Sequence, residues 1–419
     1  MSSTMRFMGA ILLAVVATAA NAMGQEQTGY QVDRLADHIY KLSVDAGGYA
    51  VKVIASVGSD GILLVDTGEK DDAESLVATL ATLGEGAPRI IINTHAHVEH
   101  TGGNAIFKGA PLIIGQRNLR ATMRSGSYLF DETPDYALPS LLFDDSLTLF
   151  FNGEEIRLLA FPGAHDNSDI VVWFVGSKIA CVAALSNGTH FPSVDGVTGD
   201  VRRYPEVVEK LIRTLPDDVL IVPGHGEDHD KAGLLTFHRM LVRTAEIVRD
   251  GLAQGKDLAT LQQDDVLSEF SSYEGSYTSK NRWIQYLVDG SQPRRTLRQL
   301  CEPLYYALKE GGAEQAVAEY YKLKADHLNE YRFGEMQLLI VPYKLMLNGR
   351  YADALPFVEL HLKEYPDGPR AWLAHYVGGR ACFELGDRRR AKQYFEESLK
   401  LNPDNEEVED YLRQLSEGD

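Results

Sequence analysis

The sequence predicts an α/β domain followed by an all-α domain of helical repeats, and two observations support this division. In residues 25–252, short runs rich in β-branched residues alternate with amphipathic helical patterns, as in domains whose sheets are covered by helices. In residues 295–419, Gly349 and Ala354 of one helix pair recur as Gly386 and Ala391 at an offset of 37 residues, and Gly311 and Ala316 lie 38 residues before the first pair, which indicates a repeat. We expect residues 253–294 to form a helical linker. The 419 residues, 44% of them hydrophobic, are enough for two cores.

The first 22 residues have the pattern of a secretory signal peptide. Arg6 precedes a thirteen-residue apolar run from Met8 to Ala20, and Ala20-Asn21-Ala22 supplies small residues on both sides of a cleavage site. The run is too short to span a bilayer, and no other stretch is apolar enough to do so. We therefore expect cleavage after Ala22 and a mature protein in the periplasm or outside the cell, without a membrane span.

Local patterns place the elements of the first domain. Alternating or continuous apolar runs predict strands, and amphipathic periodicity predicts helices. The expected strands cover 49–57, 62–65, 89–92, 112–114, 155–161, 170–175, 179–182 and 219–222, and the expected helices cover 71–83, 203–215 and 231–252, with a polar helix after Gln116. An irregular stretch with several aromatic residues lies between residues 125 and 140.

Three histidines and a carboxylate are concentrated directly after the strand at 89–92. His95, His97, Glu99 and His100 fall within six residues, and a small-residue turn follows them. Ligands collect beyond the carboxyl ends of strands in α/β sheets, and alternate residues of an extended segment point the same way. Imidazole and carboxylate groups suit Zn²⁺. The pattern predicts a metal site, although surface histidines beside a turn remain the alternative.

Four segments together resemble the metallo-β-lactamase superfamily over roughly residues 30 to 250. They are Asp66-Thr67-Gly68, the histidine cluster with its turn Thr101-Gly102-Gly103-Asn104, Pro162-Gly163-Ala164-His165 followed by Ser168-Asp169, and Val222-Pro223-Gly224-His225-Gly226. The resemblance implies a four-layered αβ/βα sandwich for the first domain.

The same resemblance implies two groups of metal ligands and one or two Zn²⁺ ions per chain. The first group comprises His95, His97 and His165, and the second comprises Glu99, His100 and His225. Two positions depart from the family pattern. Glu99 stands where the family has aspartate, and Ala184 stands where many hydrolytic members have an aspartate that bridges the two metals.

Further residues are candidates for supporting roles. By resemblance, Asp66 and Asp169 are carboxylates that fix histidine tautomers, although Asp66 could instead cap a turn. His190 could be a replacement ligand, a substrate contact or an exposed loop residue. Tyr128 and Tyr136 lie in the irregular stretch, which either walls the substrate site or is a simple surface connection with buried aromatic residues.

These features together predict an exported zinc-dependent hydrolase. A metal-bound hydroxide would open a small amide or ester substrate, β-lactam- or lactone-like, with Glu99 orienting or shuttling the proton. The net charge of −19 leaves no long basic stripe for phosphates, so we expect no nucleic-acid partner. The missing bridging aspartate counts against the thioesterases and persulfide dioxygenases of the superfamily, which rely on it.

The C-terminal pattern is similar to tetratricopeptide repeats. Gly379, Ala391, Phe395 and Pro403 match the small and aromatic positions of that motif, and residues 406–415 would form a capping helix. An ordinary helical bundle is the alternative. Such repeats often bind a protein or a peptide, which supports a second hypothesis: a catalytically decayed enzyme fold that acts as an adaptor through its repeats.

The three cysteines do not form a disulfide framework. Cys181 and Cys382 lie in apolar or helical patterns typical of packed thiols. A bridge between Cys301 and Cys382 remains open from the sequence alone.

Overall fold

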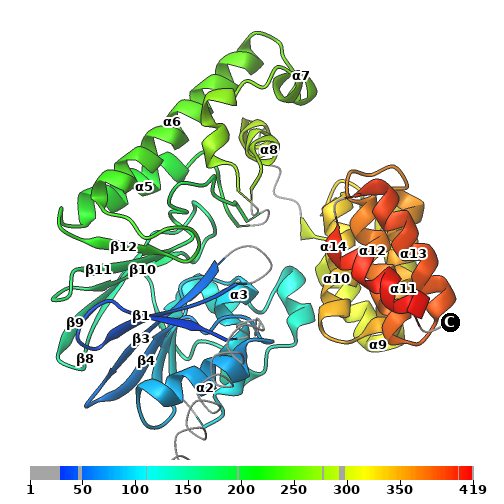
Figure 1. Ribbon diagram of the computed structural model, residues 1–419. Helices are drawn as coiled ribbons and strands as arrows, with labels where there is room; N and C mark the ends of the chain where they lie inside the picture. Colours follow the sequence, from blue (N-terminus) through cyan, green and yellow to red (C-terminus); the bar gives the residue numbers. More distant parts are fainter. Residues whose placement is uncertain are drawn as a thin grey trace, which may run out of the picture.

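The computed structural model describes residues 29–45, 50–109, 111–195, 198–275, 278–291, 298–403 and 405–417. The expected signal peptide and its cleavage point lie outside these ranges. Within them, no helix is both long enough and apolar enough to cross a membrane. Figure 1 shows a part with two β-sheets and, at one side of it, a separate group of helices.

The first sheet runs from the N-terminus to the middle of the first domain. Among the described residues it has seven strands in sequential order, antiparallel as far as β4 and parallel from β4 to β7. They are β1 (Gln31–Arg34), β2 (Ile39–Asp45), β3 (Ala50–Gly58), β4 (Gly61–Val65), β5 (Pro88–Ile92), β6 (Leu112–Gln116) and β7 (Leu141–Phe143).

The second sheet has five strands in the described part of the chain, in the order β12-β11-β10-β9-β8. Only β11 and β12 pair in parallel. The strands are β8 (Ser146–Phe151), β9 (Glu154–Ala160), β10 (Ile170–Phe174), β11 (Ile179–Ala183) and β12 (Leu220–Pro223).

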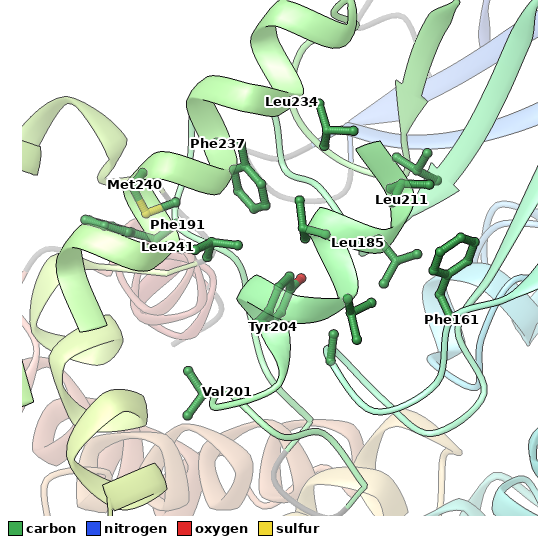
Figure 2. Packing of buried hydrophobic residues seen from close by; sticks show 14 of the residues in the cluster. Phe161, Leu185, Phe191, Val201, Tyr204, Leu211, Leu234, Phe237, Met240 and Leu241 are labelled. Atoms are coloured by element: carbon green, nitrogen blue, oxygen red, sulfur yellow. The ribbon is translucent and has the colours of Figure 1, made fainter. Parts of the chain in front are cut away.

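The two sheets pack face to face and each carries helices on its outer face. Ile92 of β5 lies in the apolar cluster between the sheets, whereas its neighbour Ile91 lies in the cluster beneath the outer helix α2 (Ala73–Leu83). This alternation follows from the two-residue period of a strand. On the other side, α5 (Tyr204–Thr214) and α6 (Lys231–Ala253) cover the second sheet, and Figure 2 shows their side chains in this packing. The expected four-layered sandwich is confirmed.

Further helices, most of them short, complete the part of the chain before residue 292. They are α3 (Val98–Thr101), α4 (Arg117–Thr122), α7 (Leu258–Gln263) and α8 (Lys280–Ser291), with the 3₁₀ helices η1 (Gly102–Ile106), η2 (Gly126–Asp131), η3 (Asp135–Ala137) and η4 (Ser268–Tyr273). The segment expected to be a linker therefore contains α7, η4 and α8. Leu261 and Trp283 from this segment are buried in the same cluster as the side chains of α5 and α6. These helices extend the outer layer of the second sheet.

The last third of the described chain is helical apart from one short strand pair, β13 (Arg298–Gln299) with β14 (Tyr331–Arg332). Its helices are α9 (Cys301–Asp326), α10 (Glu335–Leu347), α11 (Tyr351–Glu364), α12 (Ala371–Glu384), α13 (Arg388–Leu401) and α14 (Glu406–Glu417). The expected capping helix is α14.

Glycines at the turns between paired helices preserve the repeat. Gly349 and Gly386, 37 residues apart, have φ values of 71° and 81°, which only glycine adopts without strain. The sequence comparison placed the corresponding glycine of the first unit at Gly311. In the structure it is Gly312, with φ of 81°, that breaks α9 into two helices. For the turn glycine the offset of 37 residues therefore extends through all three units, whereas the buried residues Ala316 and Ala354 lie 38 residues apart.

Packing within the repeats explains the expected small and aromatic positions. A Cβ atom at Gly379 of α12 would lie 2.5 Å from the ring of Phe395 on α13, so glycine is required for this close approach. The Phe395 ring in turn stacks on Tyr411 of α14.

Cys181, Cys301 and Cys382 are all buried free thiols, and the bridge that the sequence left open is not formed.

Candidate metal centre

Six side chains from distant parts of the sequence meet at one edge of the two sheets. Their donor atoms form two groups, in each of which the ligand atoms lie within 4.8 Å of one another. The first group is His95, His97 and His165, and the second is Glu99, His100 and His225. These are the two groups that the resemblance implied.

The chain reaches this position through strand ends and tight turns. β5 ends at Ile92, and the next residues lead into α3, which carries Glu99 and His100. A Cβ atom at Gly103 would lie 2.2 Å from the carbonyl oxygen of Thr67, and one at Gly224 would lie 2.7 Å from the His100 ring. The small residues of the motifs thus allow the loops to approach one another closely.

Two histidines of the first group each keep one ring nitrogen without a partner. His95 Nδ1 lies 3.1 Å from the hydroxyl of Thr94, and His165 Nδ1 lies 3.0 Å from the carbonyl oxygen of Ser193. The Nε2 atoms of both rings are buried and have no hydrogen-bond partner among the described residues. Buried polar atoms are rarely left unpaired, so these two nitrogens are suited to a ligand.

In the second group, too, the Nδ1 atom of each histidine has a hydrogen-bond acceptor and the Nε2 atom faces the site. His100 donates its Nδ1 hydrogen to Asp66 Oδ2 at 2.8 Å, and His225 donates its Nδ1 hydrogen to the carbonyl oxygen of Ala50 at 2.9 Å. Their Nε2 atoms face each other at 3.3 Å. In these tautomers neither Nε2 atom is protonated, so the two atoms cannot form a hydrogen bond and their lone pairs repel each other. A cation between them resolves the conflict, since two tetrahedral ligands at about 2.1 Å from an ion lie about 3.4 Å apart.

Asp66 is held in place to support His100. Its residue adopts a left-handed backbone conformation with φ of 64°. Its carboxylate also accepts hydrogen bonds from the backbone N–H and the hydroxyl of Thr94, at 2.8 and 2.7 Å. The Asp66 carboxylate therefore orients the His100 ring directly. Through its two hydrogen bonds to Thr94 it also fixes the backbone between β5 and His95.

Glu99 lies between the two groups. Its Oε1 atom is 3.3 Å from His97 Nδ1 and 3.9 Å from His225 Nε2. On the other side of the His97 ring, Nε2 is 3.6 Å from the carboxylate of Asp195. Among the described residues of the first group, His97 is thus the member that pairs with carboxylates on both sides of its ring. It is also the most exposed of the three, with 18% of its side chain exposed.

Burial and charge separate the protonation behaviour of the histidines. Burial lowers the pKa of His95 well below its usual value, and the neighbouring imidazoles lower it further. Burial also lowers the pKa of His165 to about 3 and the pKa of His225 to about 4. Burial also opposes the charge on His97, but Glu99 and Asp195 outweigh it and raise the pKa of His97. Neutral imidazoles are the form that binds metal. His95, His165 and His225 are therefore in the form that a metal ion requires, whereas His97 would lose its proton when an ion binds.

Asp169 does not contact a site histidine in the described part of the structure. Its Oδ2 atom accepts the backbone N–H of Asp166 at 2.8 Å, and its Oδ1 atom is buried without a hydrogen-bond partner among the described residues. Asp166 instead approaches the histidine loop, where it accepts the N–H of Ala96 at 3.3 Å. Asp166 and Asp195 were not identified as site residues from the sequence, because only their place in the fold brings them close.

The aromatic candidates and His190 occupy different surroundings. Tyr128 lines a cavity beside the histidine loop, and burial together with Asp195 and Asp166 raises the pKa of its phenol. Tyr136 is 53% exposed, and its hydroxyl lies 3.3 Å from the carbonyl oxygen of Ala105. His190 packs beside Gly226 and Gly275 and belongs to neither donor group.

Ala184 contributes no donor to the site. It is buried, and its carbonyl oxygen accepts a hydrogen bond from the Tyr204 hydroxyl.

A cluster of charges stabilises the turn that carries His225. Lys52 contacts the carbonyl oxygen of Gly226 and, at 2.7 Å, the carboxylate of Asp228, which also pairs with Lys41.

Comparison with known proteins finds similarity to metallo-beta-lactamases in the first domain and to a tetratricopeptide repeat in the second. Residues 47–225 match the model of the metallo-beta-lactamase superfamily, and residues 372–405 match a tetratricopeptide repeat. A type 2 metallo-beta-lactamase of Elizabethkingia meningoseptica is 24% identical over 240 residues, which cover 54% of this chain and 90% of that protein. The metallo-beta-lactamase IND-1 of Chryseobacterium indologenes is 23% identical over 196 residues, 45% of this chain and 78% of that protein. A solved metallo-beta-lactamase from Pontibacter korlensis has a TM-score of 0.42 at 16% identity, covering 51% of this chain and 98% of that one.

Proposed function

Because residues 47–225 form a metallo-beta-lactamase domain and residues 372–405 a tetratricopeptide repeat, we propose that the protein is an exported zinc-dependent hydrolase. Its substrate is a small amide or ester, β-lactam- or lactone-like. The observation that carries the proposal is the set of buried, proton-free Nε2 atoms. Two of them have no hydrogen-bond partner among the described residues, and two face each other at 3.3 Å. The N-terminal pattern of residues 1–22 supports export.

The residues present divide the work of such a reaction. His95, His97 and His165 would hold the first ion, and Glu99, His100 and His225 the second. Bound zinc lowers the pKa of a coordinated water toward about 7 and polarises a carbonyl group. Asp66 and the carbonyl oxygens of Ser193 and Ala50 fix the tautomers of the histidines that they contact.

Glu99 is the residue that we assign to proton handling. Its carboxylate lies between His97 and His225, and the pKa of Glu99 is lowered because the charges of His97 and its neighbours outweigh the effect of burial. An ionised carboxylate in this position can accept a hydrogen bond from the attacking water and orient it. The same carboxylate would serve as the one oxygen donor of the second group.

A second proposal, from another class, is an adaptor that acts through the repeats. Ala184 favours it, because a methyl group replaces the carboxylate that bridges two metals in many hydrolytic members. The tetratricopeptide match is also typical of protein binding. The intact donor groups favour the hydrolase.

Metal content per chain separates the two proposals. Elemental analysis of untagged protein purified without added metal should give two zinc ions per chain, and hydrolysis of a chromogenic β-lactam and of a simple lactone should follow. One ion per chain with turnover would keep the hydrolase and remove the second site. Absence of bound metal even after zinc is supplied would contradict the hydrolase and favour the adaptor.

A further inference from the structure

A cavity beside the histidine loop is shared by the two parts of the chain. Its volume is about 200 Å³, far above the roughly 10–15 Å³ that a single water requires. Ala96 and Val98, which alternate with the metal-binding candidates, form one wall, and Tyr128 forms another. Leu347 and Asn348, at the end of α10 in the repeat helices, close the far side. None of the six donor side chains lines the cavity, but Ala96 and Val98 are their neighbours in the chain. The repeat domain therefore borders a space beside the loop that carries the metal-binding candidates.

The contact between the two parts is built from buried groups. Phe130 of η2 is 1% exposed because it lies in the apolar cluster of the repeat helices, where its ring packs against Tyr305 at a centroid distance of 5.1 Å. The carbonyl oxygen of Phe130 accepts a hydrogen bond from Asn348 at 2.9 Å. The loop of the first domain is thus inserted into the core of the second.

Charge pairs fix the same loop. Lys344 of α10 contacts both carboxylate oxygens of Asp131, at 2.7 and 2.6 Å, and its ammonium group also lies 5.0 Å from the centre of the Tyr128 ring. Glu132 pairs with Lys309 and Arg350, each at 3.1 Å. Cations of the repeat domain thereby neutralise two acidic residues of the cavity wall and hold Tyr128 against the histidine loop.

The side of α10 that faces the first domain also lies within electrostatic reach of the metal centre. Burial raises the pKa of Tyr343, and the carboxylates of Glu69 and Glu99 add to this effect. The η2 loop of the same chain covers part of the surface around α9 and α10. A partner protein could not bind to that part of the repeat domain.

From these contacts we infer that the repeat domain is a substrate-recognition element of the enzyme. Leu347 and Asn348, together with Tyr128, form a subsite for an uncharged apolar acyl or aryl group attached to the carbonyl that is hydrolysed. The inference rests on the proposed function for its reaction. Glu69, Lys70 and Asp71 line another part of the cavity, and the acidic groups of Asp131 and Glu132 are paired with cations of the repeat domain. The ligand class is assigned from Ala96, Val98 and Leu347, which are apolar and offer affinity through burial of apolar surface.

Substitution of Leu347 with a matched control tests the subsite. Leu347 is 52% exposed at the end of α10, and Leu385 is 50% exposed at the end of α12, away from the cavity. Leu347→Trp fills the cavity, whereas Leu385→Trp places the same bulk elsewhere on the repeats. Both positions are half exposed, so we expect folded proteins, which melting temperatures within a few degrees of the parent would verify.

The first readout is hydrolysis of N-acetyl and N-octanoyl derivatives of one β-lactam or lactone ring. The parent should prefer the octanoyl compound by at least about tenfold in kcat/KM, which burial of two methylene groups would account for. Leu347→Trp should lose at least about fivefold on the octanoyl compound and less than about twofold on the acetyl compound. Leu385→Trp should change neither. Equal loss on both compounds in Leu347→Trp, or no loss, would overturn the subsite.

The second readout does not depend on turnover. Equilibrium binding of octanamide and of acetamide is measured with zinc-loaded and with zinc-free protein. Octanamide should bind equally well to the parent and to Leu385→Trp. It should bind at least about fivefold more weakly to Leu347→Trp. This pattern without hydrolysis of any ring compound would uphold the subsite and defeat the proposed function. Hydrolysis without chain-length preference, and without octanamide binding, would uphold the function and defeat the subsite.

Discussion

The two donor groups come largely from the same turn but are held in different ways. The first group has three imidazoles, and the Nδ1 atoms of His95 and His165 are fixed by a hydroxyl and a carbonyl oxygen. The second group depends on Glu99, whose carboxylate lies closer to His97 than to His225. The first group therefore consists of imidazoles alone, whereas the second shares its carboxylate with His97 of the first group. We expect the first ion to bind more tightly.

Loss of a donor from the first group should have the largest effect. His97→Ala removes one of three imidazoles, so the first ion should be lost and kcat/KM should fall by at least about 10³-fold, on the order of 4 kcal/mol of transition-state stabilisation. The measurement is zinc content together with turnover. His190→Ala is the control, since His190 belongs to neither group, and it should lose less than about twofold. Retained turnover in His97→Ala would contradict the proposed role of the first group.

Acid should destabilise the metal-free protein through histidines of both groups. The folded-state pKa values of His165 and His225, about 3 and about 4, lie below the usual value of about 6.5. The unfolded chain therefore binds more protons between pH 6.5 and 4, and stability falls as pH falls. Each histidine should cost about 2 kcal/mol between pH 6.5 and 5. His97 has a raised pKa, so its contribution is present below pH 6.5 and is lost only as pH rises.

Urea unfolding of the metal-free protein at pH 6.5 and pH 5 measures this dependence. His165→Gln and His225→Gln should each reduce the difference between the two pH values by about 2 kcal/mol. Both folded-state pKa values lie below pH 5, so the two variants should change the difference by the same amount. An unchanged difference in both variants would mean that these imidazoles are protonated in the folded protein.

Loss of a donor from the second group should have a smaller effect. His225→Ala leaves the first group intact, so one zinc ion per chain should remain and kcat/KM should fall by at least about tenfold. His229→Ala is the matched control, because His229 contacts Ser186 at 2.8 Å and belongs to neither group. Loss of both ions from His225→Ala would show that the groups do not bind independently.

The difference between the groups also bounds what the sequence could predict. The continuous apolar run of β5, which is covered on both faces, and the alternation of β9 placed both strands within one residue at each end. The histidines were recognisable because their spacing alone is unusual. Asp166 and Asp195 approach His97 and Ala96 only after the chain folds, and a single aspartate in a loop has no distinguishing pattern. The inserted Phe130 loop likewise depends on a contact between residues about 200 positions apart.

The helical half shows the same limit at smaller scale. The recurring glycines were visible, but Gly311 and Gly312 are adjacent, and composition cannot tell which of them takes a positive φ. Residues 253–294 lack a strong strand or repeat pattern, and burial of Trp283 beneath α6 depends on the tertiary fold. Tyr128 and Tyr136 were equal candidates in the sequence. Only Tyr128 lies at the cavity, because η2 is anchored by Lys344 and Asn348.

The smallest effect that we predict is a gain, in Ala184→Asp. A carboxylate at this position should add an oxygen donor to the second group and tighten the second zinc ion by roughly tenfold, as measured by competition with a chelator. Ala184→Asn adds nearly the same volume without the charge and should give no gain. A tighter second ion in the aspartate variant alone would mean that the missing carboxylate weakens the second group. An unchanged affinity would mean that residue 184 does not face the second group, and the weakness would then rest with Glu99.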